Sequence, residues 1–293
     1  MNTTKIGNIT EKAMLVTLNI SRWQARKSDK VLSQEIADNH HNQRDMIDTR
    51  KRLLAKNALE ELNQIASRAR VLHYELTLPW NDDNQRILAA TAFFKYQETM
   101  EDLKNEWVPA VRKFIYNYPD YVKQAQIDLN GLFNQADYPD AAEIPHKFKL
   151  NYTVYPMPDA QDFRVKLNGE EVSRIKQEME ASVNAQLQNA TRDIYNRMIA
   201  VVTKLRNKLN ECSKSDDEAK TIFRDSLVNN IIDVLDMIPL INVLEDQNII
   251  DFADKIRREL TLYEPDQLRS SVVARQSTSE AADEILKKMQ EYI

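Results

Sequence analysis

A regular apolar stripe near the middle of the chain constrains the fold more than any other feature. From Val172 to Leu209 it spans 37 residues in ten intervals, a mean spacing of 3.7. That value is close to the 3.6-residue period of an α-helix, so it predicts one long, nearly straight helix over residues 170–211. The stripe comprises Val172, Ile175, Met179, Val183, Leu187, Ala190, Ile194, Met198, Val201, Leu205 and Leu209.

A second stripe lies in the stretch from Val31 to Leu78, which contains neither proline nor glycine. Its intervals of 4, 3, 4, 3 and 4 residues are those of a heptad seam, and the whole stretch would form a rod of about 65–70 Å. The first half is polar ("NHHNQRD"), so we expect looser packing or a break there. The sequence leaves open whether the seam pairs within the chain or between chains, and we expect the protein to be a homo-oligomer. The seam residues are Ala58, Leu62, Ile65, Ala69, Leu72 and Leu76.

The bounds of the next helices are predicted from the prolines that end or interrupt a helix. Pro79 ends the rod, a second helix runs from about Asn84 to Tyr118, and Pro109 should kink or divide it because proline removes a backbone donor. A third helix starts after Pro119 and stops close to residue 131. Short connections between long helices predict antiparallel neighbours.

Three short runs alternate apolar and polar residues and are predicted to be strands. They are residues 15–20 near the N-terminus, the run "KFKLNYTVY" that ends at Tyr155, and "FRVKL" at 163–167. A two-stranded ribbon is marginal alone, so we expect the N-terminal run to join the other two in one small sheet. The fold class is therefore mostly α with a small antiparallel β-sheet (α+β), built on an elongated bundle or coiled coil of long helices.

These elements predict three regions. Residues 14–167 hold the N-terminal strand, the helical hairpin and the sheet, and residues 168–263 hold the long helix and a bundle. Residues 264–293 hold a linker over 264–278 and a terminal amphipathic helix. That helix carries Ile285, Met289 and Ile293 along one side. It can dock on its own bundle or on another subunit, and its own bundle is favoured.

Composition narrows the function. Only three glycines among 293 residues, with 29% charged residues, favour long solvated helices over glycine-rich turns. The single cysteine, Cys212, allows no internal disulfide and no cysteine-rich zinc site. No signal-peptide core and no uninterrupted apolar span is present, so we expect no membrane association and a cytoplasmic protein.

One basic cluster, "SRWQARKSDK", surrounds Trp23 with four cations. In one interpretation Trp23 stacks on a nucleobase while the cations hold phosphates. In the other, which we favour, Trp23 anchors the chain where strand gives way to helix, with Arg22 or Arg26 over its ring. Residues 1–60 hold 11 Lys and Arg against 7 Asp and Glu, so nucleic-acid binding would be local. The possible binding surface is Arg22, Trp23, Arg26, Lys27 and Lys30.

No catalytic motif appears. The sequence lacks a phosphate-binding loop, G-x-S-x-G and H-E-x-x-H. Asp38, His41, Asp45 and Asp48 would share one face of a helix, but one helix cannot close around an ion, so a solvated face is the favoured interpretation. A metal-dependent hydrolase stays as the second alternative. We otherwise expect no enzyme, no cofactor and no metal.

The stretches "MLVTLNISRWQARK" at 14–27 and "DFRVKLNGEE" at 162–171, with long helices between them, resemble an uncharacterised family from tailed phages and integrative elements. The resemblance implies a bacterial host and a protein partner, since such proteins are companions of MoxR-type AAA+ ATPases and von Willebrand A-type proteins. It supplies no site residues. Because long helices expose much lateral surface, we expect a non-enzymatic interaction or scaffold protein that presents an elongated helical surface, with a nucleic-acid-processing accessory as the alternative.

Overall fold

The computed structural model describes residues 9–41, 43, 46–81, 84–162, 165, 168–212 and 224–293. The chain is mostly helical with a small antiparallel sheet, which confirms the predicted fold class. It divides into two compact units, of which unit 1 comprises residues 1–17, 73–96 and 153–293, and unit 2 comprises residues 18–72 and 97–152. Each unit is described by itself.

The sheet has four strands in the order β4-β5-β1-β6. Strand β1 (Ala13–Ser21) pairs antiparallel with β5 (Gln85–Ala89), which pairs antiparallel with the two-residue β4 (Leu78–Pro79). The fourth strand is β6 (Lys149–Pro156). The predicted strands at 15–20 and near Tyr155 are thus confirmed. Of the run at 163–167 only Val165 is described, and it lies outside any strand.

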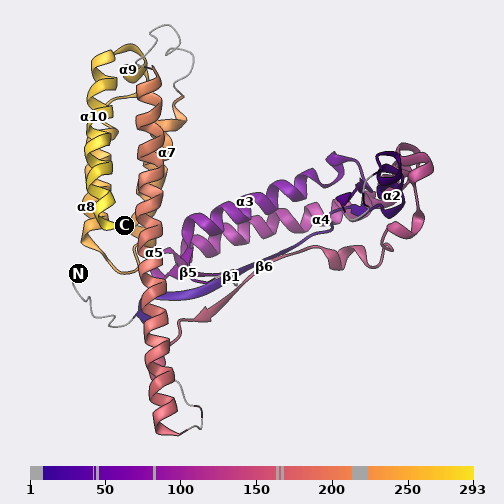
Figure 1. The fold of residues 1–293 in the computed structure, drawn as a ribbon, viewed down its shortest axis with the longest axis horizontal. Coiled ribbons are helices and arrows are strands. Elements are labelled where there is room, and N and C mark those ends of the chain that lie inside the picture. Colours follow the sequence, from indigo (N-terminus) through magenta and orange to yellow (C-terminus); the bar gives the residue numbers. More distant parts are fainter. Residues whose placement is uncertain are drawn as a thin grey trace. The chain divides into compact units, whose positions relative to one another are not determined.

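Unit 1 is built on helix α5 (Gly169–Cys212), which confirms the helix predicted from the apolar stripe. The later half of α5 packs with α7 (Ser226–Ile241) and α10 (Val272–Met289), and α8 (Gln247–Leu260) contacts both of these helices. Figure 1 shows these helices running alongside the later half of α5. The buried core includes Ile194, Met198, Leu205, Leu209, Ile231, Leu235, Ile256 and Ile285.

Unit 1 also includes the short helix α1 (Ile9–Lys12) and the 3-10 turns η3 (Ala90–Ala92), η7 (Ala160–Asp162) and η8 (Gln290–Tyr292). The segment expected to be a linker, 264–278, is instead helix α9 (Pro265–Ser270) followed by the start of α10. Local caps explain the difference, because Glu264 and Gln267 form a capping box and the Ser271 side chain accepts from the backbone of α10.

Unit 2 contains two helices that lie side by side, α3 (Glu60–Leu76) and α4 (Phe93–Leu129), in the parts of them that belong to this unit (Figure 1). Lys113 Nζ lies 2.8 Å from Glu61 Oε2, and Arg68 pairs with Glu106. As the residue number rises on α3 it falls on α4, so the two helices are antiparallel, as predicted.

The predicted rod over 31–78 is wrong in its first half. That stretch forms α2 (Lys30–Asn39) and the strand β3 (Arg50–Arg52), which pairs antiparallel with β2 (Arg26–Ser28) before the 3-10 turn η2 (Lys56–Leu59) leads into α3. The polar first half offers no apolar stripe to hold a helix against a neighbour, so the chain breaks where the sequence loses its heptad.

Helix α4 also differs from the prediction of two helices divided at Pro119. It continues through Pro109 and Pro119 for 37 residues. Each proline costs about 3 kcal/mol in a helix interior, and the buried face of α4 outweighs that cost because it carries large side chains in almost every turn. The buried residues on α4 are Tyr96, Met100, Leu103, Trp107, Ala110, Phe114, Tyr118 and Ala125.

After α4 the chain crosses the surface of unit 2 in 3-10 turns, η4 (Asn130–Leu132), η5 (Gln135–Asp137) and η6 (Ile144–Lys147), before β6. An aromatic core holds this segment. The centroid of the Phe148 ring lies 5.2 Å from that of Phe114 and 6.4 Å from that of Trp107. Tyr118 and Tyr138 fasten it by donating hydroxyl hydrogen bonds to the backbone oxygens of Pro139 and Leu53.

The three predicted regions do not match the two units. In the chain, α3 lies between β1 and β5 and α4 lies between β5 and β6, so unit 2 is assembled from two separate stretches of chain. A division by sequence position alone misses this arrangement. Among the described residues no helix is both long enough and apolar enough to cross a membrane.

Candidate functional site

The first half of α5 differs sharply from the second half. From Gly169 to Gln186 no side chain is buried, and the first buried residue of the helix is Leu187. Within unit 1, Figure 1 shows this part of α5 extending past α7, α8 and α10. At 1.5 Å per residue these 18 residues span about 27 Å.

The apolar stripe nevertheless continues through the uncovered part of α5. Val172, Ile175, Met179 and Val183 are each only half-buried, and of the described elements outside the bundle, the strand β4 and the short turn η7 pack on α5. Completing the burial of four such side chains would contribute on the order of 4 kcal/mol. The apolar period of the bundle half thus persists in this part of α5, where the four side chains remain only half-buried.

Polar interactions hold this uncovered segment in helical form. The Asn168 side chain accepts from the Glu171 backbone N–H at 2.8 Å and so caps the helix. Arg174 then bridges Glu171 and Glu178 at 2.7 and 2.8 Å, and these pairs raise the pKa of the guanidinium. Negative side chains in the first turn also suit the helix dipole. The segment is therefore an ordered, amphipathic helix face.

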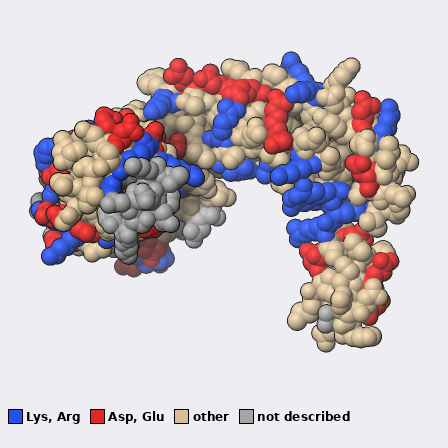
Figure 2. Space-filling model, turned by 90° about the horizontal axis from the view of Figure 1, so that it is seen from above, with Lys and Arg blue, Asp and Glu red and all other residues tan. Residues whose placement is uncertain are grey.

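A second candidate site is a pocket of about 380 Å³ in unit 2, which collects part of the predicted basic cluster. Arg22, Trp23 and Arg26 line it, but Lys27 pairs with Asp137 and Lys30 is an exposed residue at the start of α2. Figure 2 shows a dense group of Lys and Arg side chains in the right-hand part of the view. Three more cations line the pocket and were missed by the sequence analysis, namely Arg52, Lys56 and Arg70.

Trp23 is half-buried and packs edge-on against Tyr118, with ring centroids 5.7 Å apart and an interplanar angle of 76°. Arg22, which was expected as a possible cover for this ring, instead donates to Asn63 on α3. Burial, together with the nearby Arg70, lowers the pKa of Arg22. Trp23 is thus both anchored by Tyr118 and part of the pocket wall.

The predicted heptad residues lie on α3 and on the turn before it. Leu62, Ile65, Ala69 and Leu76 are buried within the single chain, while Ala58 and Leu72 are half-buried. The stripe is thus covered by the chain's own residues, with α4 alongside. Self-association stays a prediction and requires a face other than this one.

The predicted docking helix lies within α10 and its end. Ile285 and Met289 are fully buried in the bundle of unit 1, whereas Ile293 is 46% exposed. Contacts of α10 with α5 and α8 show that the helix docks on its own chain. This is the arrangement that the sequence analysis favoured over docking on another subunit.

The candidate metal ligands do not assemble. Asp38 and His41 lie at the end of α2, Asp48 pairs with Arg50 at 3.2 Å, and Asp45 is outside the described residues. Within the described ranges, no group of three or more His, Cys, Asp or Glu is placed to hold a metal ion. Cys212 is a buried free thiol at the end of α5.

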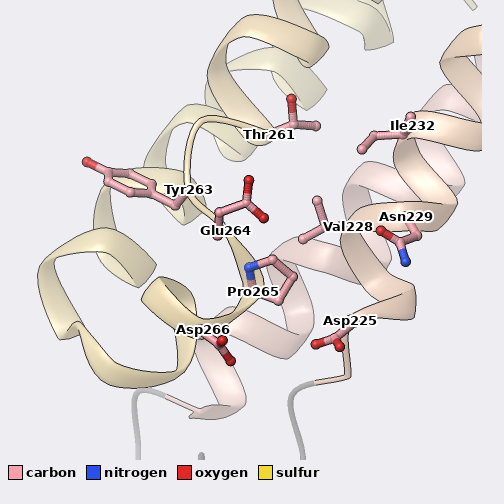
Figure 3. A pocket seen from close by; sticks show the side chains of 9 residues that line it. All are labelled: Asp225, Val228, Asn229, Ile232, Thr261, Tyr263, Glu264, Pro265 and Asp266. Carbon is pink, nitrogen blue, oxygen red and sulfur yellow. The ribbon is translucent and has the colours of Figure 1, made fainter.

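A second pocket, of about 470 Å³, lies in unit 1 between the start of α7 and the loop from α8 to α9. Figure 3 shows Asp225 and Asp266 at one end of it and Thr261 and Ile232 at the other. Both aspartates pair with Arg269, and Glu264 belongs to the capping box of α9. These carboxylates are engaged in holding helix ends together, so the pocket offers no assembled chemistry.

No family model, curated protein or solved structure matches this chain. Two features of the chain itself, the uncovered face of α5 and the arginine-lined pocket, are the candidate functional surfaces.

Proposed function

We propose that this chain is a non-enzymatic interaction protein that binds a protein partner through the uncovered first half of α5. The observation that supports this function is the half-buried stripe of Val172, Ile175, Met179 and Val183 on a capped, regular helix. An amphipathic helix face of this kind is completed by an apolar groove or by a second amphipathic helix. Long helices also expose much lateral surface, which suits a scaffold role better than the enclosure of a small substrate.

The sequence resemblance to proteins of tailed phages and integrative elements supplies the partner class. We propose that the partner is a MoxR-type AAA+ ATPase from the same phage or mobile element. The experiment below also detects binding to a second copy of this chain. Association must overcome several kcal/mol of lost translational and rotational freedom. The four stripe residues alone therefore give weak binding, and we expect the partner to contact flanking residues of α5 as well.

Sedimentation velocity of the purified chain, alone and mixed with the ATPase, tests the proposal. We expect a species with the summed mass, or a dimer of the chain alone, and loss of that species in Met179→Asp. Gln177→Asp is the matched control, because Gln177 is exposed about 200° around the same helix and receives the same new charge.

Two results would contradict this function. One is a chain that stays monomeric at all concentrations and does not bind the ATPase. The other is an association that Gln177→Asp weakens as much as Met179→Asp does, because the contact would then depend on charge rather than on the apolar stripe. Far-UV circular dichroism of both variants checks that α5 remains helical.

A further inference from the structure

The two-stranded ribbon of unit 2 brings like charges face to face. Its register places Arg26 opposite Arg52 and Lys27 opposite Lys51. Like charges directly opposite one another on a strand pair are destabilising. Each pair is therefore stabilised by a nearby negative charge where one is present. The two pairs differ in whether the chain supplies that charge.

The lysine pair is neutralised within the chain. Lys27 Nζ and Lys51 Nζ each lie 2.8 Å from a carboxylate oxygen of Asp137, and Asp29 lies 3.9 Å from Lys51. Lys51 also donates to the backbone oxygen of Leu132 at 2.8 Å. Hydrogen bonds from the two lysines lower the pKa of Asp137. This pair is a compact ion cluster that joins the ribbon to the turn after α4.

The arginine pair has no such compensation. Arg26 and Arg52 line the pocket of about 380 Å³ together with Arg22, Lys56 and Arg70, and no Asp or Glu is among the described residues that line it. In the described part of the chain neither arginine of the pair has an ion-pair partner. Five cations thus surround one concavity without a negative side chain in its wall.

Arg22 provides a second, independent observation that favours an anionic ligand. Its Nη1 donates to the Asn63 side chain, but its Nε is buried and has no acceptor among the described residues. A buried guanidinium N–H without an acceptor is costly, and an anionic oxygen in the pocket would supply that acceptor.

We propose that this pocket binds a compact oligophosphate, such as inorganic triphosphate or the triphosphate chain of a nucleotide. Guanidinium groups bind phosphate oxygens with two parallel hydrogen bonds, and several of them around one cavity match several phosphate groups. Trp23 in the wall offers an aromatic surface for a base, which would favour the nucleotide over the inorganic ion.

A compact ligand fits better than an extended nucleic-acid strand. A strand requires a track of free cations along the surface. Outside the pocket, however, α3 has Arg68 paired with Glu106, and Lys113 on α4 pairs with Glu61. The cations of the pocket, in contrast, enclose a cavity whose described lining holds no Asp or Glu, and its volume is at the small end of the range for ligand pockets.

Isothermal titration calorimetry of the full chain with tripolyphosphate, ATP and a 20-nucleotide oligothymidylate at physiological salt tests this proposal. We expect one bound tripolyphosphate or ATP per chain, and at least tenfold weaker binding in Arg52→Gln. Arg68→Gln is the matched control, because it removes an arginine from α3 outside the pocket and should leave the affinity within twofold. Should Arg52→Gln fail to fold, Arg70→Gln on α3 tests the same pocket.

Tighter binding of ATP than of tripolyphosphate would identify the nucleotide as the source of the phosphates. Absence of binding by both compounds overturns the proposal. Equal losses in Arg68→Gln and Arg52→Gln overturn it too, since the effect would then reflect general charge. Binding of the oligothymidylate alone contradicts a compact ligand and points to a nucleic-acid strand.

Discussion

His73 provides a sharp test of how unit 1 is held together. Its side chain is buried, and its Nδ1 lies 2.9 Å from the Tyr96 hydroxyl oxygen. Burial, followed by the nearby positive charge of Arg86, lowers the pKa of His73 to about 4. The unfolded chain has an ordinary histidine pKa of about 6.5, so between these values the unfolded state binds more protons than the folded state.

The sign and the size of the effect follow from that difference. Because the folded pKa is depressed, the stabilisation by neutral His73 is complete above about pH 6.5 and is lost as the pH falls towards 4. Over the interval from pH 7 to pH 5 the loss amounts to about 2 kcal/mol, and it reaches about 3 kcal/mol below pH 4.

Urea unfolding of the wild type and of His73→Gln at pH 7, 6 and 5 measures this contribution. Glutamine keeps a polar group near Tyr96 but does not titrate, so the variant should lose about 2 kcal/mol less than the wild type over this interval. Equal losses in the two proteins would refute the reasoning. An NMR titration in which the His73 resonance moves with a pKa near 6.5 would refute it as well.

Three further substitutions test the ion cluster of unit 2, the core of the bundle and the uncovered face of α5. Asp137→Asn leaves two lysines without their shared carboxylate and should lower the free energy of unfolding by about 2–3 kcal/mol. Its control is Asp140→Asn on the exposed neighbouring turn, which should change the free energy of unfolding by less than about 0.5 kcal/mol. Ile285→Ala opens a cavity in the bundle of unit 1 and should cost about 2–5 kcal/mol in denaturant unfolding. Met179→Asp should cost less than about 1 kcal/mol, because its site on α5 is not buried; a cost as large as that of Ile285→Ala would mean that α5 is covered there.

The long helices were predictable because burial imposes a period on the sequence. The stripe from Val172 to Leu209 predicted α5 almost to the residue, and the heptad from Ala58 to Leu76 predicted α3. Alternation predicted β1 and β6 in the same way. In the two helices one face of a single element meets the core, so the local sequence contains the signal.

The elements that were missed depend on other parts of the chain. Pro109 and Pro119 argue for breaks, and only the packing of the whole buried face of α4 overrides them. Strand β5 (Gln85–Ala89) is too short to show alternation and forms because β1 offers a partner. The ribbon of β2 and β3 has three residues in each strand, nearly all charged, and so carries no apolar pattern.

The candidate sites, too, could be predicted from the sequence only where their residues are neighbours in the chain. Arg22, Trp23 and Arg26 could be selected from the sequence because they are neighbours in it. Arg52 and Arg70 join them only through strand pairing and the placement of α3, and the "RKR" run at β3 was the one local signal for the former. For α5 the stripe itself was visible, but which half of it the chain leaves uncovered is set by the packing of the bundle.

Hydrogen–deuterium exchange of the chain, alone and with the MoxR-type ATPase, measures whether the first half of α5 is the surface that binds the proposed partner. If the first half of α5 is the binding surface, exchange slows on binding in the peptides covering residues 169–186 and stays unchanged in the part of α5 already buried by α7 and α10. Protection that appears elsewhere while residues 169–186 exchange as in the free chain would contradict it.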